Sequence, residues 1–153
     1  MQNKDNFTAL MENFTLKLRD KKLDDSLTDE LNLNYSFETE TFKNMQMSCQ
    51  KGIEEGWLCQ NEHGGIKYGR VLNDINGYSV DVVVMTDIVG PHHAHPKGEI
   101  DLIMPIEGNA KFDKHAAGWV VYGPGSSHRP TVTDGTAIVL YLLPDGEIDF
   151  SRP

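Results

Sequence analysis

From Trp57 onward the chain consists of short β-favouring runs separated by turn residues, and this pattern constrains the fold most. In chain order the runs are IKYGRVL (66–72), YSVDVVVM (78–85), EIDLIMPI (99–106), GWVVYG (118–123), TAIVLYLL (136–143) and EIDF (147–150). All seven prolines follow Trp57. Asn-Gly at 76–77 and Asp-Gly at 134–135 and 145–146 are typical of hairpin turns. Several strands at this spacing predict a mainly β fold, an antiparallel sandwich or a small barrel of the jelly-roll type.

Residues 1–56 have a helical character instead. Apolar side chains recur there at three- and four-residue spacing and form one stripe: Phe7, Leu10, Met11, Phe14 and Leu18. Ser26 is predicted to cap a second helix, and a third is predicted over 40–56, ended by Gly56. Because such short helices are unstable alone, we expect 1–56 to pack on a barrel domain of 57–153 as one globular unit. A dimer interface is the alternative use of the apolar stripe.

The charge of the chain excludes two classes of partner. With 153 residues and a formal net charge of −9, it lacks the basic face that nucleic acids or anionic membranes require. A small anionic ligand is still compatible, because a local pocket can be positive. The longest apolar run, 137–143, is too short to span a bilayer, and the first residues do not resemble a signal peptide. We expect a cytoplasmic protein in which Cys49 and Cys59 are reduced thiols.

The stretch GPHHAHPKGEID, residues 90–101, is the most unusual in the chain, with three histidines and two carboxylates. His93 and His95 are two residues apart, so on a strand both side chains point to one face. The Pro-Lys-Gly turn that follows can bring Glu99 back beside the two imidazoles. The stretch therefore predicts half of a metal site, and the alternatives are a pH-sensitive loop or a polar surface turn.

His128, which follows a Pro-Gly pair in YGPGSSHRP, offers a fourth donor. Three imidazole nitrogens and one carboxylate oxygen suit one divalent transition metal ion, such as Fe, Mn, Zn, Ni or Co, better than calcium or magnesium. His92 points to the other face of the strand and is predicted to line the pocket rather than bind the metal. His63 and His115 lie in turn-like sequence and are predicted to be exposed.

The same residues resemble the two metal-binding motifs of the cupin superfamily. HHAHPKGE contains His-x-His-x3-Glu, flanked by Gly90 and Gly108, and PGSSH contains Gly-x2-His. The second motif departs from the usual pattern in two ways: Pro124 and Gly125 are adjacent, and Val132 stands where an asparagine is usual. The resemblance implies a small cupin-like β-barrel. It also implies that the metal ligands are His93, His95, Glu99 and His128.

Longer strings are similar to one cupin family, the 4-hydroxylaminobenzoate lyases. They are GIEEGWLCQNEHGGIKYGR, GYSVDVV, GPHHAHPKGEIDLIMP, GWVVYGPGSSHRPTV and VLYLLPDGEIDF, within residues 52–150. The helical N-terminus matches only in length and character. The resemblance implies that 4-hydroxylaminobenzoate and water are converted to 3,4-dihydroxybenzoate (protocatechuate) and ammonium, a reaction of bacterial nitroaromatic breakdown.

The resemblance also suggests roles for residues around the metal. The metal would act as a Lewis acid or hold the attacking hydroxide. Asp101 lies two residues from Glu99 on the same strand face and is the candidate acid or base. The alternative is that Asp101 holds the ring of a ligand histidine. Glu99 and His92 complete the set of catalytic candidates.

The carboxylate of such a substrate requires a cation. Arg129 directly follows His128, and Arg70 lies two residues from Tyr68 on one strand face, so either arginine could bind a benzoate through two hydrogen bonds. Lys67 points the opposite way, and each of these residues could instead be a surface cation. Side chains that could stack on the substrate ring, or belong to the core, are Tyr68, Tyr122 and Trp119.

Three other functions fit the same motifs. They are a different metal-dependent cupin enzyme acting on a small aromatic acid, such as a dioxygenase or an isomerase, a non-catalytic cupin that binds a small molecule, and a storage barrel. Because all four ligand positions are filled, the storage reading is the weakest. We expect a homodimer or higher oligomer. If the helices leave the outward face of Ile100, Leu102 and Met104 uncovered, a partner subunit is expected to cover it.

Overall fold

The computed structural model describes residues 3–150 and places three helices before eight strands. The helices are α1 (Lys4–Leu16), α2 (Asp25–Asn34) and α3 (Glu40–Glu55). The strands are β1 (Asn61–His63), β2 (Ile66–Ile75), β3 (Tyr78–Val89), β4 (His93–His95), β5 (Glu99–Phe112), β6 (Gly118–Tyr122), β7 (Ser126–His128) and β8 (Thr131–Pro144). The change of sequence character near Trp57 is therefore the change from helix to strand. No helix in the described range is long and apolar enough to cross a membrane.

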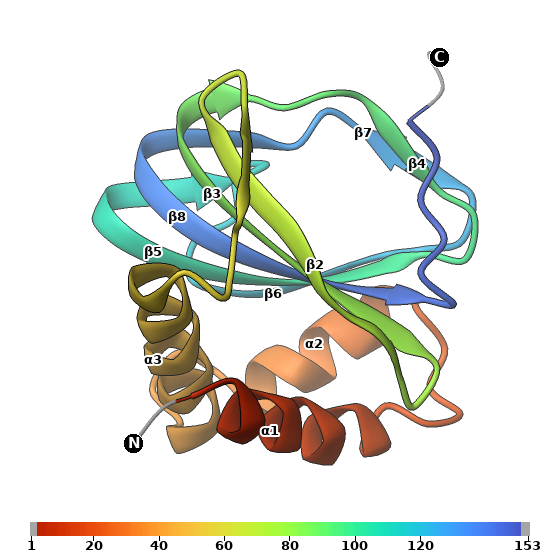
Figure 1. The fold of residues 1–153 in the computed structure, drawn as a ribbon. Coiled ribbons are helices and arrows are strands. Elements are labelled where there is room, and N and C mark those ends of the chain that lie inside the picture. Colours follow the sequence, from red (N-terminus) through yellow and green to blue (C-terminus); the bar gives the residue numbers. More distant parts are fainter. Residues whose placement is uncertain (1–2, 151–153) are drawn as a thin grey trace.

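All strand pairs are antiparallel, and they form two sheets. Six strands follow the order β1-β2-β3-β8-β5-β6, and β4 pairs with β7 in a separate two-stranded sheet. The large sheet curves around an interior whose far side is covered by β4 and β7 (Figure 1). The predicted mainly β, jelly-roll type fold is confirmed. Hydrogen bonds do not close the described strands into a continuous barrel, because no strand of the large sheet pairs with β4 or β7.

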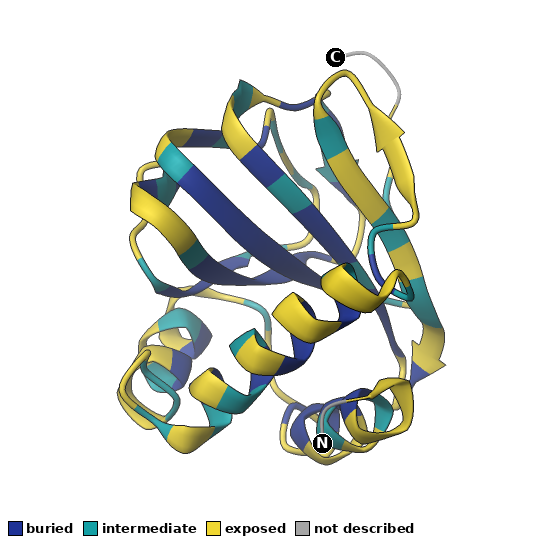
Figure 2. Cartoon of the chain, turned by 60° about the vertical axis from the view of Figure 1, so that its left-hand side comes forward, coloured by how far each residue is buried: buried dark blue, intermediate teal, exposed yellow. Residues whose placement is uncertain are grey.

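The three helices cover the outer face of the large sheet (Figure 1). Alternate residues of β5, Ile100, Leu102 and Met104, are fully buried in one core cluster with Phe7 and Met11 of α1. Figure 2 shows the same division, with buried positions along the strands and exposed positions on the outer faces of the helices. The helices therefore cover the face that would otherwise have called for a partner subunit.

The other alternate residues of these strands face the interior between the two sheets. Val139 and Tyr141 of β8 and Ile103 of β5 belong to a second core cluster there. Glu99 and Asp101 precede Ile103 at the same parity and are fully buried. Since both faces of these central strands are covered, their sequences are nearly continuous apolar runs in which a carboxylate is conspicuous.

The helix ends follow the sequence closely, with one correction. Thr39 caps α3 by accepting a hydrogen bond from the Phe42 amide, and Gly56 ends it in the left-handed conformation at φ 84°. The predicted cap of α2 was Ser26, but the cap is Asp24, whose side chain accepts a hydrogen bond from the Leu27 amide. Aspartate is as suitable as serine at the cap position, and with Asp24 as the cap the helix begins two residues earlier than predicted.

The turn signals were less reliable than the strand signals. The Asn-Gly pair at 76–77 joins β2 to β3, with φ of 52° and 91°, as predicted. The Asp-Gly pair at 134–135 is no hairpin, because it lies inside β8. The pair at 145–146 turns the chain at the end of β8, but the segment after it does not pair with β8. EIDF (147–150) is no regular strand either; its Asp149 makes an isolated bridge with Ala94 of β4.

Both cysteines are free thiols, as predicted. Cys49 is buried in the core between the helices and the sheet. Cys59 is half-buried and donates from its Sγ to the carbonyl oxygen of Val82. Burial raises the pKa of the Cys59 thiol to about 12, so it stays protonated at neutral pH.

Candidate metal centre

Three short elements bring the four predicted ligands together. In the β4–β7 pair, His93 lies opposite His128 and His95 lies opposite Ser126. Glu99 opens β5, which β4 reaches through the turn that ends at Gly98. Gly98 has φ of 93°, and a Cβ there would lie 2.8 Å from the Tyr122 carbonyl oxygen, so glycine is needed for this turn. The predicted return of Glu99 toward the two imidazoles is therefore what this turn produces.

The donor atoms of the four side chains converge on one point and lie within 4.8 Å of one another. The Nε2 atoms of His93 and His95 are 3.4 and 3.3 Å from Oε1 of Glu99. Nε2 of His128 is 3.6 Å from Oε2 of Glu99 and 3.1 Å from Nε2 of His93. Three of the four side chains are buried, and His128 is 12% exposed.

This arrangement fits a metal ion better than a hydrogen-bond network. Among the described residues, the buried Nε2 of His95 and both carboxylate oxygens of Glu99 have no hydrogen-bond partner. Buried polar atoms without partners destabilise a fold unless a cation or water satisfies them. Ligand atoms at about 2.0–2.2 Å from a shared ion lie roughly 3 to 3.6 Å apart, which matches the close contacts. The set of three histidines and one glutamate can therefore hold one transition metal ion.

Two side chains that the sequence did not indicate, Asp113 and Ser126, contact the ligand histidines at the ring nitrogens that face away from the cluster. Nδ1 of His128 lies 2.5 Å from Oδ2 of Asp113, and Nδ1 of His95 lies 2.9 Å from Oγ of Ser126. These contacts leave Nε2 of each ring as the ligand atom. Tyr122 also donates to Asp113, at 2.5 Å. Ser126 could have been suspected from its closeness to His128 in sequence, whereas nothing local marks Asp113.

Asp113→Asn is expected to weaken metal affinity roughly tenfold to a hundredfold, because the amide is a much weaker acceptor for the His128 ring. Burial opposes the charge of Asp113, but the hydrogen bonds from His128 and Tyr122 hold its pKa below the usual range, so it is a carboxylate at neutral pH. Competition with a chelator measures the affinity. Asp134→Asn, on an exposed residue, is the control. Unchanged affinity in Asp113→Asn would show that the contact does not support the metal.

The two buried carboxylates beside the site have opposite electrostatic behaviour. Burial opposes the charge of Glu99, but its contacts with His93 and His95 outweigh burial and hold its pKa well below the usual range. Burial raises the pKa of Asp101 well above its usual range, and the neighbouring Glu99 carboxylate raises it further. Neither oxygen of Asp101 has a hydrogen-bond partner among the described residues, so Asp101 does not hold a histidine ring here.

A cavity of about 440 Å³ opens beside the ligand cluster, and His93 forms part of its wall. The lining is mostly apolar, with side chains from β2, β3, β8 and the C-terminal segment. Arg70 is the only lysine or arginine among the described residues that line it. The other lining residues are Asn61, His63, Ile66, Tyr68, Gly69, Asp81, Val83, Met85, Gly90, Pro91, Pro130, Tyr141, Ile148 and Phe150.

A row of polar side chains runs across the sheet from this cavity toward the ligand cluster. Arg70 of β2 pairs with Asp81 of β3, Asp81 with Tyr141 of β8, and Tyr141 with Asp101 of β5. Directly opposed residues of adjacent strands place their side chains on the same face. Arg70 binds Asp81 through Nε and Nη2, at 2.9 and 3.2 Å. Tyr141 lies in the apolar run AIVLYLL, which predicts a buried strand. Nothing in that run indicates that Tyr141 belongs to a site.

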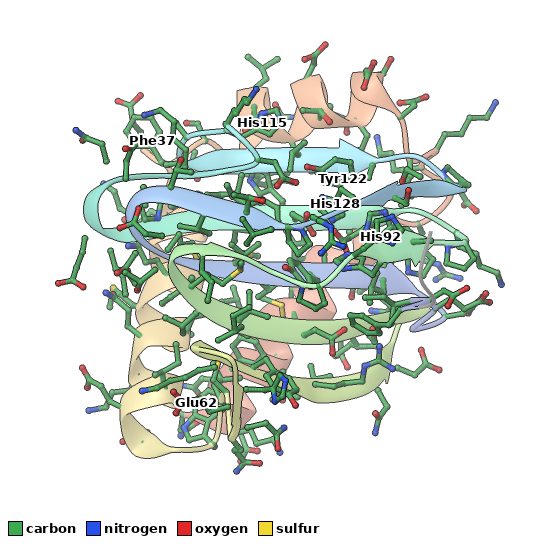
Figure 3. All side chains as sticks on the ribbon, turned by 90° about the horizontal axis from the view of Figure 1, so that it is seen from above. Phe37, Glu62, His92, His115, Tyr122 and His128 are labelled. Carbon is green, nitrogen blue, oxygen red and sulfur yellow. The ribbon has the colours of Figure 1, made fainter. Side chains whose placement is uncertain are left out.

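The remaining predicted site residues lie in different places. Arg129 is exposed and does not line the cavity. The ring of Tyr122 packs on His128 and His95, with centroids 4.6 and 5.5 Å away, so it backs the ligands instead of facing the cavity. Tyr122, His128 and His92 lie close to one another in the view from above (Figure 3). His92 is half-buried, outside the cavity lining, and its buried Nδ1 has no partner among the described residues.

Trp119 belongs to the core under the helices, where its ring stacks on Phe14 at 4.9 Å. It therefore lies on the face of the sheet away from the cavity. His63 and His115 are exposed, as predicted. His63 nevertheless contributes to the cavity lining, which its turn-like sequence does not reveal.

Comparison with known proteins assigns the chain to a family. The sequence model of the PnbB, 4-hydroxylaminobenzoate lyase, family matches residues 9–150. The chain belongs to the 4-hydroxylaminobenzoate lyase family. It is 29% identical to the 4-hydroxylaminobenzoate lyase of Pseudomonas putida, over 98% of this chain and 97% of that protein. It is 27% identical to the one from Nocardioides sp. strain LMS-CY, over 90% of this chain and 88% of that protein.

The family resemblance in the sequence is thus confirmed, and the helical N-terminus is part of the match. Solved structures that resemble this 4-hydroxylaminobenzoate lyase family member include an RmlC-like cupin protein from Ralstonia eutropha. The TM-score is 0.42 at 17% identity, and the likeness covers 56% of this chain and 59% of that chain. Less than two thirds of that structure is therefore matched, and a likeness of this size concerns the fold alone.

Proposed function

We propose that this protein is a lyase that converts 4-hydroxylaminobenzoate and water to 3,4-dihydroxybenzoate and ammonia, which becomes ammonium at neutral pH. One observation beyond family membership carries the proposal. The cluster of three histidines and one glutamate borders a mostly apolar cavity in which Arg70 is the only arginine or lysine among the described lining residues. An apolar cavity with one cation and a metal-binding wall suits an aromatic carboxylate.

The reaction needs no external oxidant, because the N–O bond is reduced while a ring carbon is oxidised. The hydroxylamine oxygen must leave as water, and one water must add at the ring carbon next to the nitrogen-bearing one. A second water must replace the nitrogen, which leaves as ammonia, so one water is consumed in total. His93, His95, Glu99 and His128 would hold the metal ion, which would supply Lewis acidity at this end of the cavity. The remaining requirements are that the chain holds the ring in place and moves protons.

The polar row across the sheet supports a division of these tasks. Arg70 has Nη1 without a hydrogen-bond partner among the described residues, because its bonds to Asp81 and to the Gly146 carbonyl oxygen use Nε and Nη2. We assign the substrate carboxylate to Arg70 and proton transfer to Asp101. Asp101 does not line the cavity itself, but its cross-strand neighbour Tyr141 does.

Arg70→Ala is expected to raise KM for 4-hydroxylaminobenzoate roughly thirtyfold, since a hydrogen bond to a charged group is lost. KM for uncharged phenylhydroxylamine should change less than about twofold, because that substrate lacks the carboxylate. Steady-state kinetics on both substrates measures the difference. Arg129→Ala is the matched control and should change neither value. Equal effects of Arg70→Ala on the KM values of both substrates would show that Arg70 does not bind the substrate carboxylate.

The proposed function is tested by a product assay without oxygen. Metal-replete protein is incubated anaerobically with 4-hydroxylaminobenzoate, and protocatechuate and ammonium are followed together. Equal molar amounts of both are expected. If the metal-replete protein forms neither product, the substrate assignment is wrong. A requirement for oxygen would favour a dioxygenase instead.

A further inference from the structure

The C-terminal segment after β8 contributes two side chains to the wall of the cavity. The turn at Asp145 and Gly146 directs the chain away from the large sheet, and the segment then runs beside β4 (Figure 1). Two backbone hydrogen bonds fix it there: the Ala94 amide donates to the Asp149 carbonyl oxygen at 2.7 Å, and the Asp149 amide donates to that of Ala94 at 3.0 Å. The segment is therefore attached to the strand that carries two of the metal ligands.

This attachment turns two apolar side chains toward the cavity. Ile148 and Phe150 flank Asp149, so in an extended segment they point to the same side, and both line the cavity. The Phe150 ring centroid lies 5.5 Å from that of His93, at an interplanar angle of 63°. Phe150 is nevertheless 57% exposed, so most of its ring has no protein partner. A ligand in the cavity would cover apolar surface that is otherwise in water.

Side-chain contacts from Lys97 and Arg70 hold the start of this segment. Lys97 binds Asp145 at 2.5 Å and Glu147 at 3.2 Å, and it lies in the turn between the ligand strands. On the other side, Nη2 of Arg70 donates to the Gly146 carbonyl oxygen at 3.1 Å. A Cβ at Gly146, whose φ is 66°, would lie 2.9 Å from Nη1 of Arg70, so glycine permits this approach. The position of the segment is thus fixed relative to both the ligand turn and the cavity cation.

We propose that residues 145–150 form the outer wall of the ligand cavity and that Phe150 determines its preference for a flat aromatic ring. Tyr68, 42% exposed, is a second lining aromatic ring with free surface. Aromatic rings favour planar partners in offset or edge-on contact over puckered rings of the same size. The inference rests on the proposed function for the identity of the ligand, and it adds the residue that selects the ring beside His93.

The test measures binding of benzoate and cyclohexanecarboxylate to the metal-replete protein by calorimetry. Both ligands carry one carboxylate and differ in the flatness of the ring, so the ratio of their dissociation constants isolates ring recognition. The wild-type protein is expected to prefer benzoate. Phe150→Ala should weaken benzoate binding roughly tenfold and reduce the preference, since the aromatic contact is lost. Phe150→Leu keeps the apolar bulk without the aromatic ring. It should also reduce the preference for benzoate, but it should weaken cyclohexanecarboxylate binding less than Phe150→Ala does.

Phe37→Ala is the matched control, because Phe37 is 54% exposed, does not line the cavity and lies apart from His92 and His128 (Figure 3). It should leave both dissociation constants unchanged. An unchanged benzoate preference in Phe150→Ala, with metal content and melting temperature retained, would overturn the role of Phe150. So would a wild-type protein without any preference. A preference that depends on Phe150 in a protein that forms no protocatechuate would uphold this inference and remove the lyase function.

Discussion

Glu99→Gln is expected to abolish stable metal binding and to lower turnover of 4-hydroxylaminobenzoate roughly a thousandfold. The glutamine has the same shape, but it removes the only negative charge from a ligand set whose other three members are neutral imidazoles. A Lewis acid contributes several kcal/mol to transition-state stabilisation, and about 4 kcal/mol corresponds to a factor of about 10³. Metal content by mass spectrometry and the initial rate are measured on the same preparation.

Glu107→Gln is the control on the same strand, because Glu107 is exposed at the far part of β5. It should retain one metal per chain and the full rate. If Glu99→Gln keeps both its metal and its rate, then Glu99 is not a ligand and the metal has another site. If it loses the metal but keeps the rate, the metal supports the structure and takes no part in the reaction.

The parts of this fold that follow from the sequence are those determined by neighbouring residues. His93 and His95 share a face because they are two apart on a strand, and that holds whatever the strand pairs with. The same parity places Glu99 and Asp101 in the interior and Ile100 and Leu102 under the helices. The approach of Glu99 to His93 and His95 could therefore be expected from neighbouring residues, whereas His128 was named through its own motif. The structure brings these four side chains together, and their binding of a metal ion stays a prediction.

The parts that could not be predicted depend on pairings between distant segments. Asp113 follows β5 directly and reaches His128 because the end of β5 pairs with the start of β8, which comes just after β7. Tyr141 lies beside Asp101 only through the β5–β8 register. An Asp-Gly pair favours positive φ both in a hairpin turn and at an irregular point within a strand. The pair at 134–135 therefore does not distinguish a turn from the continuous strand β8. EIDF has the composition of a strand, but its partner is a three-residue strand, and a single bridge forms.

Asp101→Asn is expected to lower kcat by roughly two to three orders of magnitude while one metal per chain stays bound. Loss of a positioned acid or base has effects of this size, and asparagine keeps the shape of the side chain but can neither donate an acidic proton nor accept one as a carboxylate does. Asp101 is outside the four-residue ligand cluster, so the metal should not be affected. Single-turnover rates and metal content on the same sample measure both quantities.

Tyr141→Phe is the companion variant that shows how Asp101 reaches the substrate. Asp101 is fully buried, and Tyr141 is the cavity-lining residue paired with it across the strands. If the two side chains act as one unit, each single variant should lose about as much as the double variant, because residues in one chain of proton transfer are strongly non-additive. Independent, additive losses would assign them separate tasks. Full activity of metal-bound Asp101→Asn would show that this carboxylate is not the acid or base, and the proton would then have to come from a group that lines the cavity.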